Sequence, residues 1–251
     1  MKIVSYNING VRASSKNGLK EFIKNCNADC YAFQETRADG QIVEELLNTP
    51  GYNLFHKEGN KKGYAGVAVL TKNRLNAKQV EFGNISDTEG RILAVEIGDI
   101  LLVDFYTPNG NSRLDFKLDY MTQFLQILKT KLNSGKQIVV CTDFNISHSP
   151  LDLSNPDQCK NISGYLPQER QLFDNYLDAG MVDSFRKLYP LDNRYTWSSY
   201  GSKKLNNSIG NLWTFDYVFV SNSLESNLLG AGVLLDVNCS DHYPVFATME
   251  E

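Results

Sequence analysis

The sequence predicts an α/β protein in which two β-sheets pack face to face and helices cover their outer surfaces. Short apolar runs recur along the whole chain, and several are uninterrupted, as in strands that are buried on both faces. Segments with helical periodicity lie between these runs. The 251 residues are 42% hydrophobic and carry a formal net charge of −4, a composition that favours a folded core over disorder. No linker-like stretch divides the chain, so one domain spanning 1–251 is expected.

The expected strands are the short runs rich in apolar and β-branched residues. They are residues 3–6, 31–34, 66–71, 92–97, 100–106, 137–142, 215–220 and 245–249. Helices are expected where apolar residues repeat every three or four positions, and two of these patterns end at a glycine, as helices commonly do. These helices span 19–26, 114–132 and 168–180.

Composition excludes several classes of protein. The longest apolar stretch, 228–235, is far shorter than the ~20 residues that cross a bilayer, so no membrane span is expected. The first residues show neither the apolar run nor the cleavage site of a signal peptide. The five cysteines are an odd number, which favours reduced thiols in an intracellular protein.

Few side chains are available for a transition metal. Cys26 and Cys30 stand four positions apart, and buried thiols are favoured over a metal-binding pair. With only three histidines in the chain, a histidine-rich metal site is excluded. Carboxylates would have to hold any divalent cation, which favours Mg²⁺ or Mn²⁺ over zinc.

Acidic and amide side chains follow the ends of several apolar runs. Glu35 follows 31–34, Asp143 and Asn145 follow the strand that begins at 137, and Asp241 and His242 follow the apolar stretch near the C-terminus. A buried carboxylate is costly unless it is paired or binds a cation. Each one alone could be a helix cap or a turn residue, and Asp241 with His242 could be an exposed loop pair. Gathered on one rim of the sandwich, they would form a cation site.

A set of sequence blocks occurs in a fixed order over residues 2–248. The blocks are Ser5-Tyr-Asn-Ile-Asn-Gly-Val-Arg-Ala13, Gln34-Glu-Thr-Arg37, Gly63-Tyr-Ala-Gly-Val-Ala68, Glu89-Gly-Arg91, Tyr106-Thr-Pro-Asn-Gly110, Thr142-Asp-Phe-Asn145, Gly164-Tyr-Leu-Pro-Gln-Glu-Arg170, Tyr195-Thr-Trp197, Trp213-Thr-Phe-Asp-Tyr217 and Ser240-Asp-His-Tyr-Pro244. Through them the chain resembles the exonuclease III/AP (apurinic/apyrimidinic) endonuclease family of the endonuclease–exonuclease–phosphatase superfamily. A single block carries no weight, but the ordered set is not expected by chance.

The resemblance implies a four-layer α/β sandwich, with two packed mixed β-sheets flanked by helices and the site at one sheet edge. It implies a Mg²⁺-dependent DNA-repair phosphodiesterase, with Mn²⁺ as a substitute, that incises double-stranded DNA 5′ to abasic sites. Accompanying 3′→5′ exonuclease and 3′-end-cleaning activity would act on 3′-blocked DNA. The expected protein is a monomer with no membrane partner, in the cytoplasm or nucleoid if it is prokaryotic.

The resemblance also implies roles for individual residues. Glu35 would be the principal metal ligand, and the full candidate metal set is Asn7, Glu35, Asp143, Asn145, Asp241 and His242. Water would be activated or positioned by Asp143, and the candidate catalytic set is Tyr106, Asp143, Asn145, Asp216, Asp241 and His242. Whether Asp143 or His242 is the base stays open, as does the number of metal ions.

These residue types suit hydrolysis of a phosphodiester. A cation neutralises phosphate charge, a carboxylate orients or deprotonates water, and histidine and tyrosine donate to phosphate oxygens. The chain has no recognisable serine or cysteine nucleophile motif, which favours direct attack by water over a covalent intermediate.

Substrate contacts follow from the same resemblance. Trp197, Trp213 and Phe215 would form an apolar pocket for a base-free deoxyribose that is flipped out of the duplex, although Phe215 could equally be core packing. Arg91 and Tyr64 are the expected DNA contacts. Lysines at 57, 61–62 and 203–204 could grip the DNA backbone or be ordinary solvated lysines, and a pI near 5.5 gives no overall attraction to phosphate.

Two departures from the family pattern concern DNA binding. Thr214 stands where the family usually has arginine, and an arginine there would be expected to add a phosphate-facing cation and tighten DNA binding. The loop 201–212 is longer and lacks the usual arginine. These departures leave open an alternative, 3′-end processing or incision at a modified base such as uracil. A non-catalytic DNA-binding module is disfavoured because the expected catalytic residues are all present.

Overall fold

The structure, a computed structural model, describes residues 1–198 and 211–250. One six-stranded sheet, sheet A, is built from β1 (Lys2–Asn7), β2 (Cys30–Gln34), β3 (Tyr52–Lys57), β4 (Val67–Lys72), β13 (Leu228–Val233) and β14 (Val245–Met249). The other, sheet B, is built from β5 (Lys78–Val80), β6 (Ile92–Ile97), β7 (Ile100–Tyr106), β8 (Gln137–Asp143), β9 (Met181–Asp183) and β12 (Asp216–Ser221). A short ribbon pairs β10 (Trp197–Ser198) with β11 (Leu212–Trp213).

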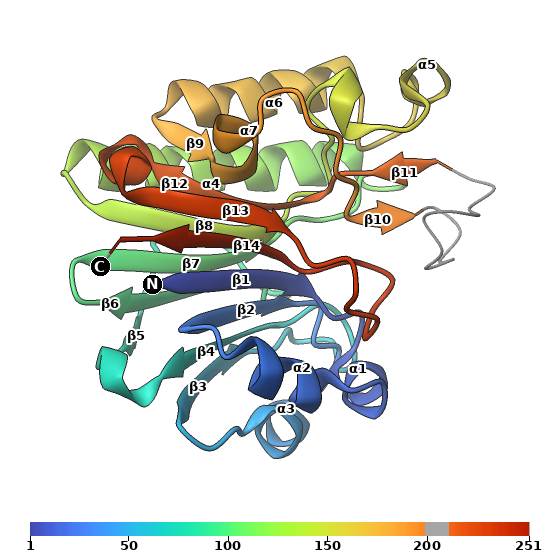
Figure 1. Ribbon diagram of the computed structural model, residues 1–251. Coiled ribbons are helices and arrows are strands. Elements are labelled where there is room, and N and C mark those ends of the chain that lie inside the picture. The colour runs from blue at the N-terminus through green and yellow to red at the C-terminus, as the bar shows by residue number, and fades with distance from the viewer. Residues whose placement is uncertain (199–210, 251) are drawn as a thin grey trace.

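Helices cover both outer faces of the paired sheets (Figure 1). The helices on sheet A are α1 (Val11–Lys16), α2 (Leu19–Cys26) and α3 (Gly40–Leu47). Those that follow sheet B strands are α4 (Leu114–Asn133), α5 (Pro156–Cys159), α6 (Pro167–Asp178) and α7 (Ser184–Leu188). Three 3₁₀ turns complete the described elements, η1 (Asn73–Leu75), η2 (Pro150–Asp152) and η3 (Asn222–Asn227).

Both six-stranded sheets are mixed. Sheet A has the order β13-β14-β1-β2-β4-β3 and sheet B the order β5-β6-β7-β8-β12-β9. The central pairs β1–β2 and β7–β8 are parallel, and the other neighbours in each sheet are antiparallel. The predicted four-layer α/β sandwich is therefore confirmed.

Apolar residues fill three layers of core, one between the sheets and one under the helices on each side. In β8, for example, Val139 faces sheet A while Ile138 and Val140 face α4 and α6. Because both faces of the strand are covered, its apolar run is uninterrupted. The same arrangement explains why the sequence alone predicts the central strands.

The predicted strands and helices are all present, with ends that differ by at most two residues from those expected. Sequence reasoning missed β3, β5, β9 and β13, which are the outermost strands of the two sheets. Edge strands have one neighbour and are partly solvated, so they lack a continuous apolar run. The apolar stretch in β13 also contains two glycines, which are uncommon in strands.

None of the five cysteines, all of which the structure describes, takes part in a disulfide bond. Cys30, Cys141, Cys159 and Cys239 are buried, and Cys26 is partly exposed. Among the described residues, no helix has the length and apolarity needed to cross a membrane.

Replacing Phe124 with alanine is expected to lower the free energy of unfolding by about 3–5 kcal/mol, because a buried ring leaves a cavity that the core cannot fill. Phe124 is 0% exposed, and its ring centroid lies 3.8 Å from that of Phe105 and 4.5 Å from that of Phe82. Urea denaturation measures the change. Leu229→Ala is the control, because Leu229 is 65% exposed and should change stability by less than about 0.5 kcal/mol.

Candidate active site

The carboxyl ends of the four central strands bring polar side chains to one edge of the sandwich. Asn7 ends β1, Glu35 follows β2, Tyr106 ends β7 and Asp143 ends β8. The Asn7 Nδ2 donates to the Asp143 Oδ2 at 2.8 Å, so this hydrogen bond joins the two sheets. Functional side chains from both sheets thus meet at this edge.

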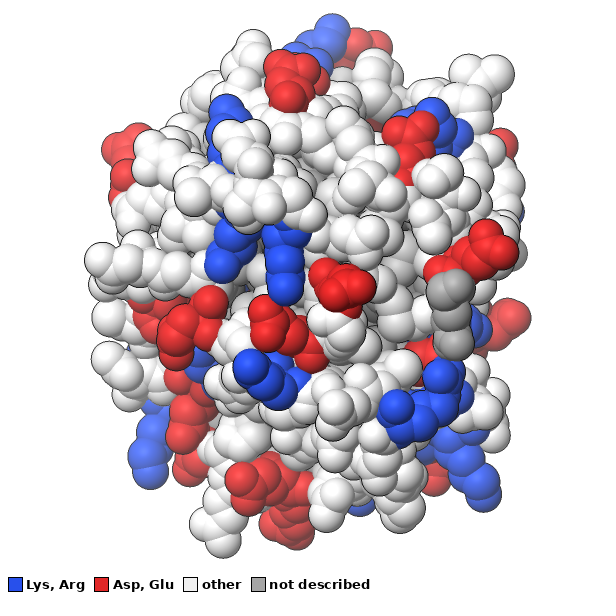
Figure 2. All heavy atoms as spheres, turned by 90° about the vertical axis from the view of Figure 1, so that its left-hand side faces the viewer, with Lys and Arg blue, Asp and Glu red and all other residues white. Residues whose placement is uncertain are grey.

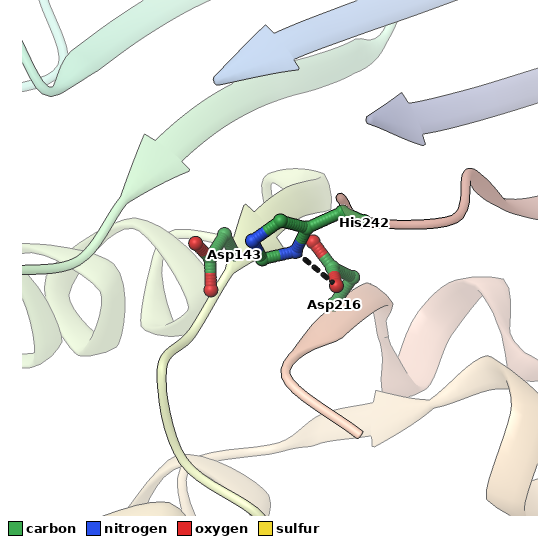
Figure 3. Close-up of side chains that lie close together, drawn as sticks. All are labelled: Asp143, Asp216 and His242. Carbon is green, nitrogen blue, oxygen red and sulfur yellow. Dashed lines mark hydrogen bonds and ion pairs between the residues drawn. The ribbon is translucent and has the colours of Figure 1, made fainter. Parts of the chain in front are cut away.

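Asp143, Asp216 and His242 form the tightest cluster at this edge (Figure 3). Asp216 begins β12 directly opposite Asp143 in the antiparallel pair, and His242 comes from the connection between β13 and β14. The His242 Nδ1 lies 2.9 Å from the Asp216 Oδ2, and one ligand atom of each of the three residues lies within 4.8 Å of the others. Across 1–198 and 211–250, no other group of three histidine, cysteine or acidic residues is as close.

Burial and mutual charge set the protonation of this cluster. Burial raises the pKa of Asp143 to about 7, against the opposing effect of His242, and the charge of Asp216 adds to the increase. Burial alone would lower the pKa of His242, but Asp216, followed by Asp143 and Asp241, outweighs it and raises the pKa to about 10. His242 is therefore a charged hydrogen-bond donor held between carboxylates.

Asp241 accepts hydrogen bonds from three side chains, one of which is the neighbouring Ser240, whose hydroxyl donates to Oδ1 at 3.1 Å. Its Oδ1 also accepts from the Asn9 Nδ2 at 2.8 Å and its Oδ2 from the Trp197 Nε1 at 3.1 Å. Burial would raise its pKa, but the charge of His242 and these two hydrogen bonds outweigh burial and place the pKa below its usual value. Asn9 was not among the expected site residues, although it stands two positions after Asn7 in the first sequence block.

Glu35 lies in a turn whose backbone is left-handed at two non-glycine residues. The φ angles are 63° at Glu35 and 48° at Arg37, and the Arg37 guanidinium hydrogen-bonds the Glu35 carboxylate. Backbone hydrogen bonds from both sides hold the turn, from the Gly10 N–H to the Glu35 carbonyl and from the Arg37 N–H to the Ala65 carbonyl, each at 2.8 Å. Glu35 lines the cleft, and strained backbone conformations of this kind cluster at functional sites.

The donor set fits a divalent cation. An open cleft of about 400 Å³ is lined by Asn7, Glu35, Asp143 and Asp241 together with cationic side chains. Arg91 and Arg113 also line the cleft, but both pair with Glu89. The four carboxylates at this edge, which include Asp216, outnumber the two remaining cations, His242 and Arg37. The Asp216 Oδ1 is buried and has no hydrogen-bond partner among the described residues. An excess of carboxylate oxygens without cationic partners suits Mg²⁺ or a similar hard cation. Glu35 lies outside the close cluster of Asp143, Asp216 and His242.

Tyr106 is held beneath the cleft by Arg91. The guanidinium of Arg91 lies 4.4 Å from the centroid of the Tyr106 ring, donates to Glu89 at 2.6 Å and to the Tyr106 carbonyl at 3.3 Å. Burial, followed by the charges of Glu35 and Asp143, raises the pKa of Tyr106 well above its usual value. Tyr106 therefore keeps its proton. Arg91 lines the cleft but is 2% exposed, so most of its hydrogen-bonding capacity is used within the protein.

Asn145 and Tyr64 both line the cleft. The Asn145 N–H donates to the Asp143 Oδ1 at 3.1 Å, and its Nδ2 donates to the Thr107 carbonyl at 3.1 Å. The Tyr64 hydroxyl accepts from the Arg113 Nη1 at 3.1 Å. Arg113 therefore lines the cleft and is held there by Tyr64 and Glu89.

An aromatic cluster adjoins the cleft. The ring centroid of Phe215 lies 5.4 Å from that of Trp197 and 5.1 Å from that of Trp213. These three residues line a second hollow of about 410 Å³. It shares Asn109, Asn145, Trp197 and Phe215 with the cleft, so the two hollows adjoin. The structure therefore brings the three expected pocket residues together.

The lysines that were expected to bind DNA differ from one another in their surroundings. Lys57 pairs with the buried Asp87 at 2.8 Å, while Lys61 lies 5.3 Å from the centroid of the Tyr64 ring at the cleft. The pair at 203–204, like most of the loop 201–212, lies outside the described residues. At the opposite edge of the sandwich, basic and acidic side chains are interspersed (Figure 2). That edge offers no single-sign surface for DNA.

The expectation for Thr214 is wrong. Thr214 is 7% exposed, its hydroxyl donates to the Arg194 carbonyl at 2.8 Å, and its N–H donates to the Asp152 carbonyl at 2.8 Å. Because position 214 points into the protein, an arginine there would not face a DNA phosphate. The preceding Trp213 and following Phe215 take the positions on the hollow.

Comparison with known proteins identifies the family. The model of the endonuclease/exonuclease/phosphatase family matches residues 4–242. An exodeoxyribonuclease of Bacillus subtilis is 37% identical over 98% of both chains, and a DNA-(apurinic or apyrimidinic site) endonuclease of Dictyostelium discoideum is 32% identical over 98% of this chain and 69% of its own. A 3′ phosphatase from Neisseria, solved with a product DNA hairpin, shares the fold with a TM-score of 0.90 at 24% identity over the whole of both chains. The chain therefore belongs to the endonuclease/exonuclease/phosphatase family, within its group of exodeoxyribonucleases and AP endonucleases.

Proposed function

We propose that this chain is a Mg²⁺-dependent DNA-repair phosphodiesterase that incises duplex DNA 5′ to abasic sites. The observation that carries the proposal is the meeting of two hydrogen-bonded pairs, Asn7 with Asp143 and His242 with Asp216, at the edge of a cleft lined by carboxylates. An AP endonuclease and an exodeoxyribonuclease among the relatives support DNA as the substrate.

Glu35 and Asn7, with Asp143 beside them, would hold the cation, and Asn145 and Asp241 are the other candidate ligands. His242 belongs to the expected ligand set as well, but with both ring nitrogens protonated it has no lone pair to offer a cation. When bound, Mg²⁺ supplies positive charge that offsets the charge of the phosphate and of the developing transition state. The carboxylates at this edge outnumber the cationic side chains that are not already paired with Glu89, which supports this assignment. Mn²⁺ has similar ligand preferences and is expected to substitute.

Asp143 is assigned as the group that orients and deprotonates water. Both of its carboxylate oxygens accept hydrogen bonds, from the Asn7 amide and the Asn145 N–H, so the carboxylate is fixed in direction. His242 already carries a proton and donates to Asp216, which suits it to donate its second N–H to a phosphate oxygen. Fixing these groups in advance removes part of the entropic cost of reaction.

Tyr106 and Asp241 complete the catalytic set. The protonated Tyr106 hydroxyl, which faces Glu35 and Asp143, is assigned as a donor to the phosphate or to the leaving oxygen. Asp241 is fixed by Asn9 and Trp197 and is assigned to the leaving-group side. Arg91 contributes by packing under the Tyr106 ring.

The aromatic hollow is assigned to the base-free sugar. Trp197, Trp213 and Phe215 give it apolar walls, and Trp197 also hydrogen-bonds Asp241, which links the hollow to the reacting phosphate. A flipped deoxyribose without its base can enter such a slot more easily than an intact nucleotide. Tyr64, which lines the cleft but not the hollow, would contact the DNA strand that flanks the lesion.

The test uses a labelled duplex with one abasic analogue, beside an intact duplex of the same sequence, each incubated with Mg²⁺ or with EDTA. A single Mg²⁺-dependent cut immediately 5′ to the lesion is expected, with no internal cut in the intact duplex. Absence of this cut over a range of salt concentrations would refute the proposed activity.

A second activity is 3′-end processing at the same site, since the relative with 37% identity is named an exodeoxyribonuclease. Ladders that start at the 3′ end of both duplexes, without the internal cut, would favour this activity. Adding uracil-containing and 3′-phosphate duplexes to the comparison separates modified-base incision from 3′-end cleaning. We propose that the protein acts as a monomer, in the cytoplasm or nucleoid if it is prokaryotic, which gel filtration and localisation of the tagged protein test.

A further inference from the structure

A fully buried ion pair lies behind the cleft and takes no part in the reaction steps above. Lys117, on α4, and Glu169, on α6, are each 0% exposed, and the Lys117 Nζ lies 2.6 Å from the Glu169 Oε1. A buried ion pair is weak evidence for stability, because removing two charges from water offsets most of their attraction. The role of this pair therefore has to be inferred from the other contacts that its two side chains make.

Lys117 contacts the backbone of a site residue. Its Nζ donates to the Asn145 carbonyl at 2.7 Å. Asn145 has a left-handed backbone with φ of 51°, and its own N–H donates to the Asp143 Oδ1. A charged donor on the carbonyl side and a carboxylate on the N–H side hold this residue in an uncommon conformation. Both ends of Asn145 are thus fixed, and so is the direction of its side chain.

Glu169 connects Lys117 to the loop that borders the aromatic hollow. Its Oε2 accepts from the Gly164 N–H at 2.6 Å and from the Leu166 N–H at 3.1 Å, while its Oε1 accepts from the Ser163 hydroxyl at 3.1 Å. Ser163 lines the hollow, and a side chain at position 164 would press against the Phe215 ring. The ion pair therefore joins the loop that carries Asn145 to the loop that forms one wall of the hollow.

We propose that Lys117, held by Glu169, is a positioning residue that fixes Asn145 for phosphodiester cleavage, an inference that rests on the proposed function. Lys117 is too deeply buried to touch DNA, so its effect passes through the Asn145 carbonyl. Small displacements of a reacting group can cost about 100-fold in rate. Loss of the Lys117 contact should therefore lower kcat more than it weakens substrate binding.

The experiment is a double-mutant cycle of Lys117→Met and Asn145→Ala, with kcat and KM measured on the abasic duplex with Mg²⁺. Lys117→Met is expected to lower kcat by about 10- to 100-fold and to change KM by less than about threefold. In the Asn145→Ala background it should cause little further loss, because both changes remove the same contribution. An equal loss of kcat in both backgrounds would overturn the inference, since a merely structural effect is independent of Asn145.

A second measurement does not depend on activity. Lys117→Met should raise amide hydrogen exchange over 144–147 at least about tenfold, because the Asn145 N–H loses its fixed geometry. Unchanged exchange would overturn the inference even in an active enzyme. If the wild type fails to cut the duplex while exchange rises as expected, the proposed function fails and the positioning contact stands.

Two further variants control for folding and for loss of charge. Lys117→Met leaves Glu169 buried without its partner, so the double variant Lys117→Met/Glu169→Gln removes both charges and leaves an amide oxygen to accept from Gly164 and Leu166. It should fold, as judged by circular dichroism, and show the same loss of kcat. Lys136→Met removes a lysine from a partly exposed pair with Glu96 at 3.0 Å, and it should leave kcat and exchange over 144–147 unchanged.

Discussion

Asp143→Asn is expected to lower kcat for cleavage of an abasic duplex by about 10²- to 10⁴-fold, the range that a positioned acid or base contributes. Asparagine has nearly the same shape as aspartate, but its amide cannot accept a proton from water. One of its two terminal atoms can still accept a hydrogen bond, whereas the other can no longer accept from Asn7 or Asn145. The fold should persist because the change removes a buried negative charge rather than a packed side chain.

Single-turnover cleavage measures the chemical step directly, and fluorescence anisotropy with the same duplex measures binding. Binding should change by less than about tenfold, because most affinity for DNA comes from contacts to the phosphate backbone. The matched control is Asp99→Asn, an exposed residue in the turn between β6 and β7 at the opposite edge, which should leave both quantities unchanged. A wild-type rate in the Asp143 variant would remove this residue from the reaction.

Glu35→Ala is expected to raise the half-saturating Mg²⁺ concentration by at least about tenfold, since carboxylate ligands provide much of the affinity for a hard cation. Arg37 would also lose its partner and bring uncompensated positive charge to the cleft. Both effects weaken cation binding. Cleavage rates measured over a range of Mg²⁺ concentrations give the midpoint, and a high concentration should restore part of the rate.

The control for this titration is Glu96→Ala, because Glu96 pairs with Lys78 and Lys136 on the surface and is not a lining residue of the cleft. Its midpoint should match that of the wild type. If Glu35→Ala also leaves the midpoint unchanged, the cation is held without Glu35. The close cluster of Asp143 with Asp216 would then be the place to look for its ligands.

The central strands could be predicted from the sequence because burial on both faces leaves a continuous apolar run. Strand β8 is the clearest example, since Ile138, Val139 and Val140 pack into two different layers of core. The edge strand β3 could not be predicted in this way, because all six of its residues are only partly buried and its sequence mixes polar with apolar side chains. Its place in the sheet depends on β4, to which it pairs.

Only part of the candidate site could be predicted from the pattern of residues alone. Carboxylates after apolar runs pointed to Glu35 and Asp143, because a charge at a buried strand end needs a partner. The role of Asp216 followed only from the family resemblance, since its closeness to His242 depends on the pairing of β12 with β8 and on a distant connection. Thr214 was misjudged because a single sequence does not show which side of a short segment faces the core.

The turn at Glu35 and Arg37 has a consequence for attempts to make this protein resistant to heat. A left-handed backbone costs a non-glycine residue on the order of 1–3 kcal/mol, and glycine would relieve that cost at either position. A selection that scores melting temperature alone would favour glycine at 35 and 37, and it would discard the carboxylate assigned to the cation together with its arginine partner. Heat-resistant variants should therefore be selected for DNA cleavage activity and melting temperature together.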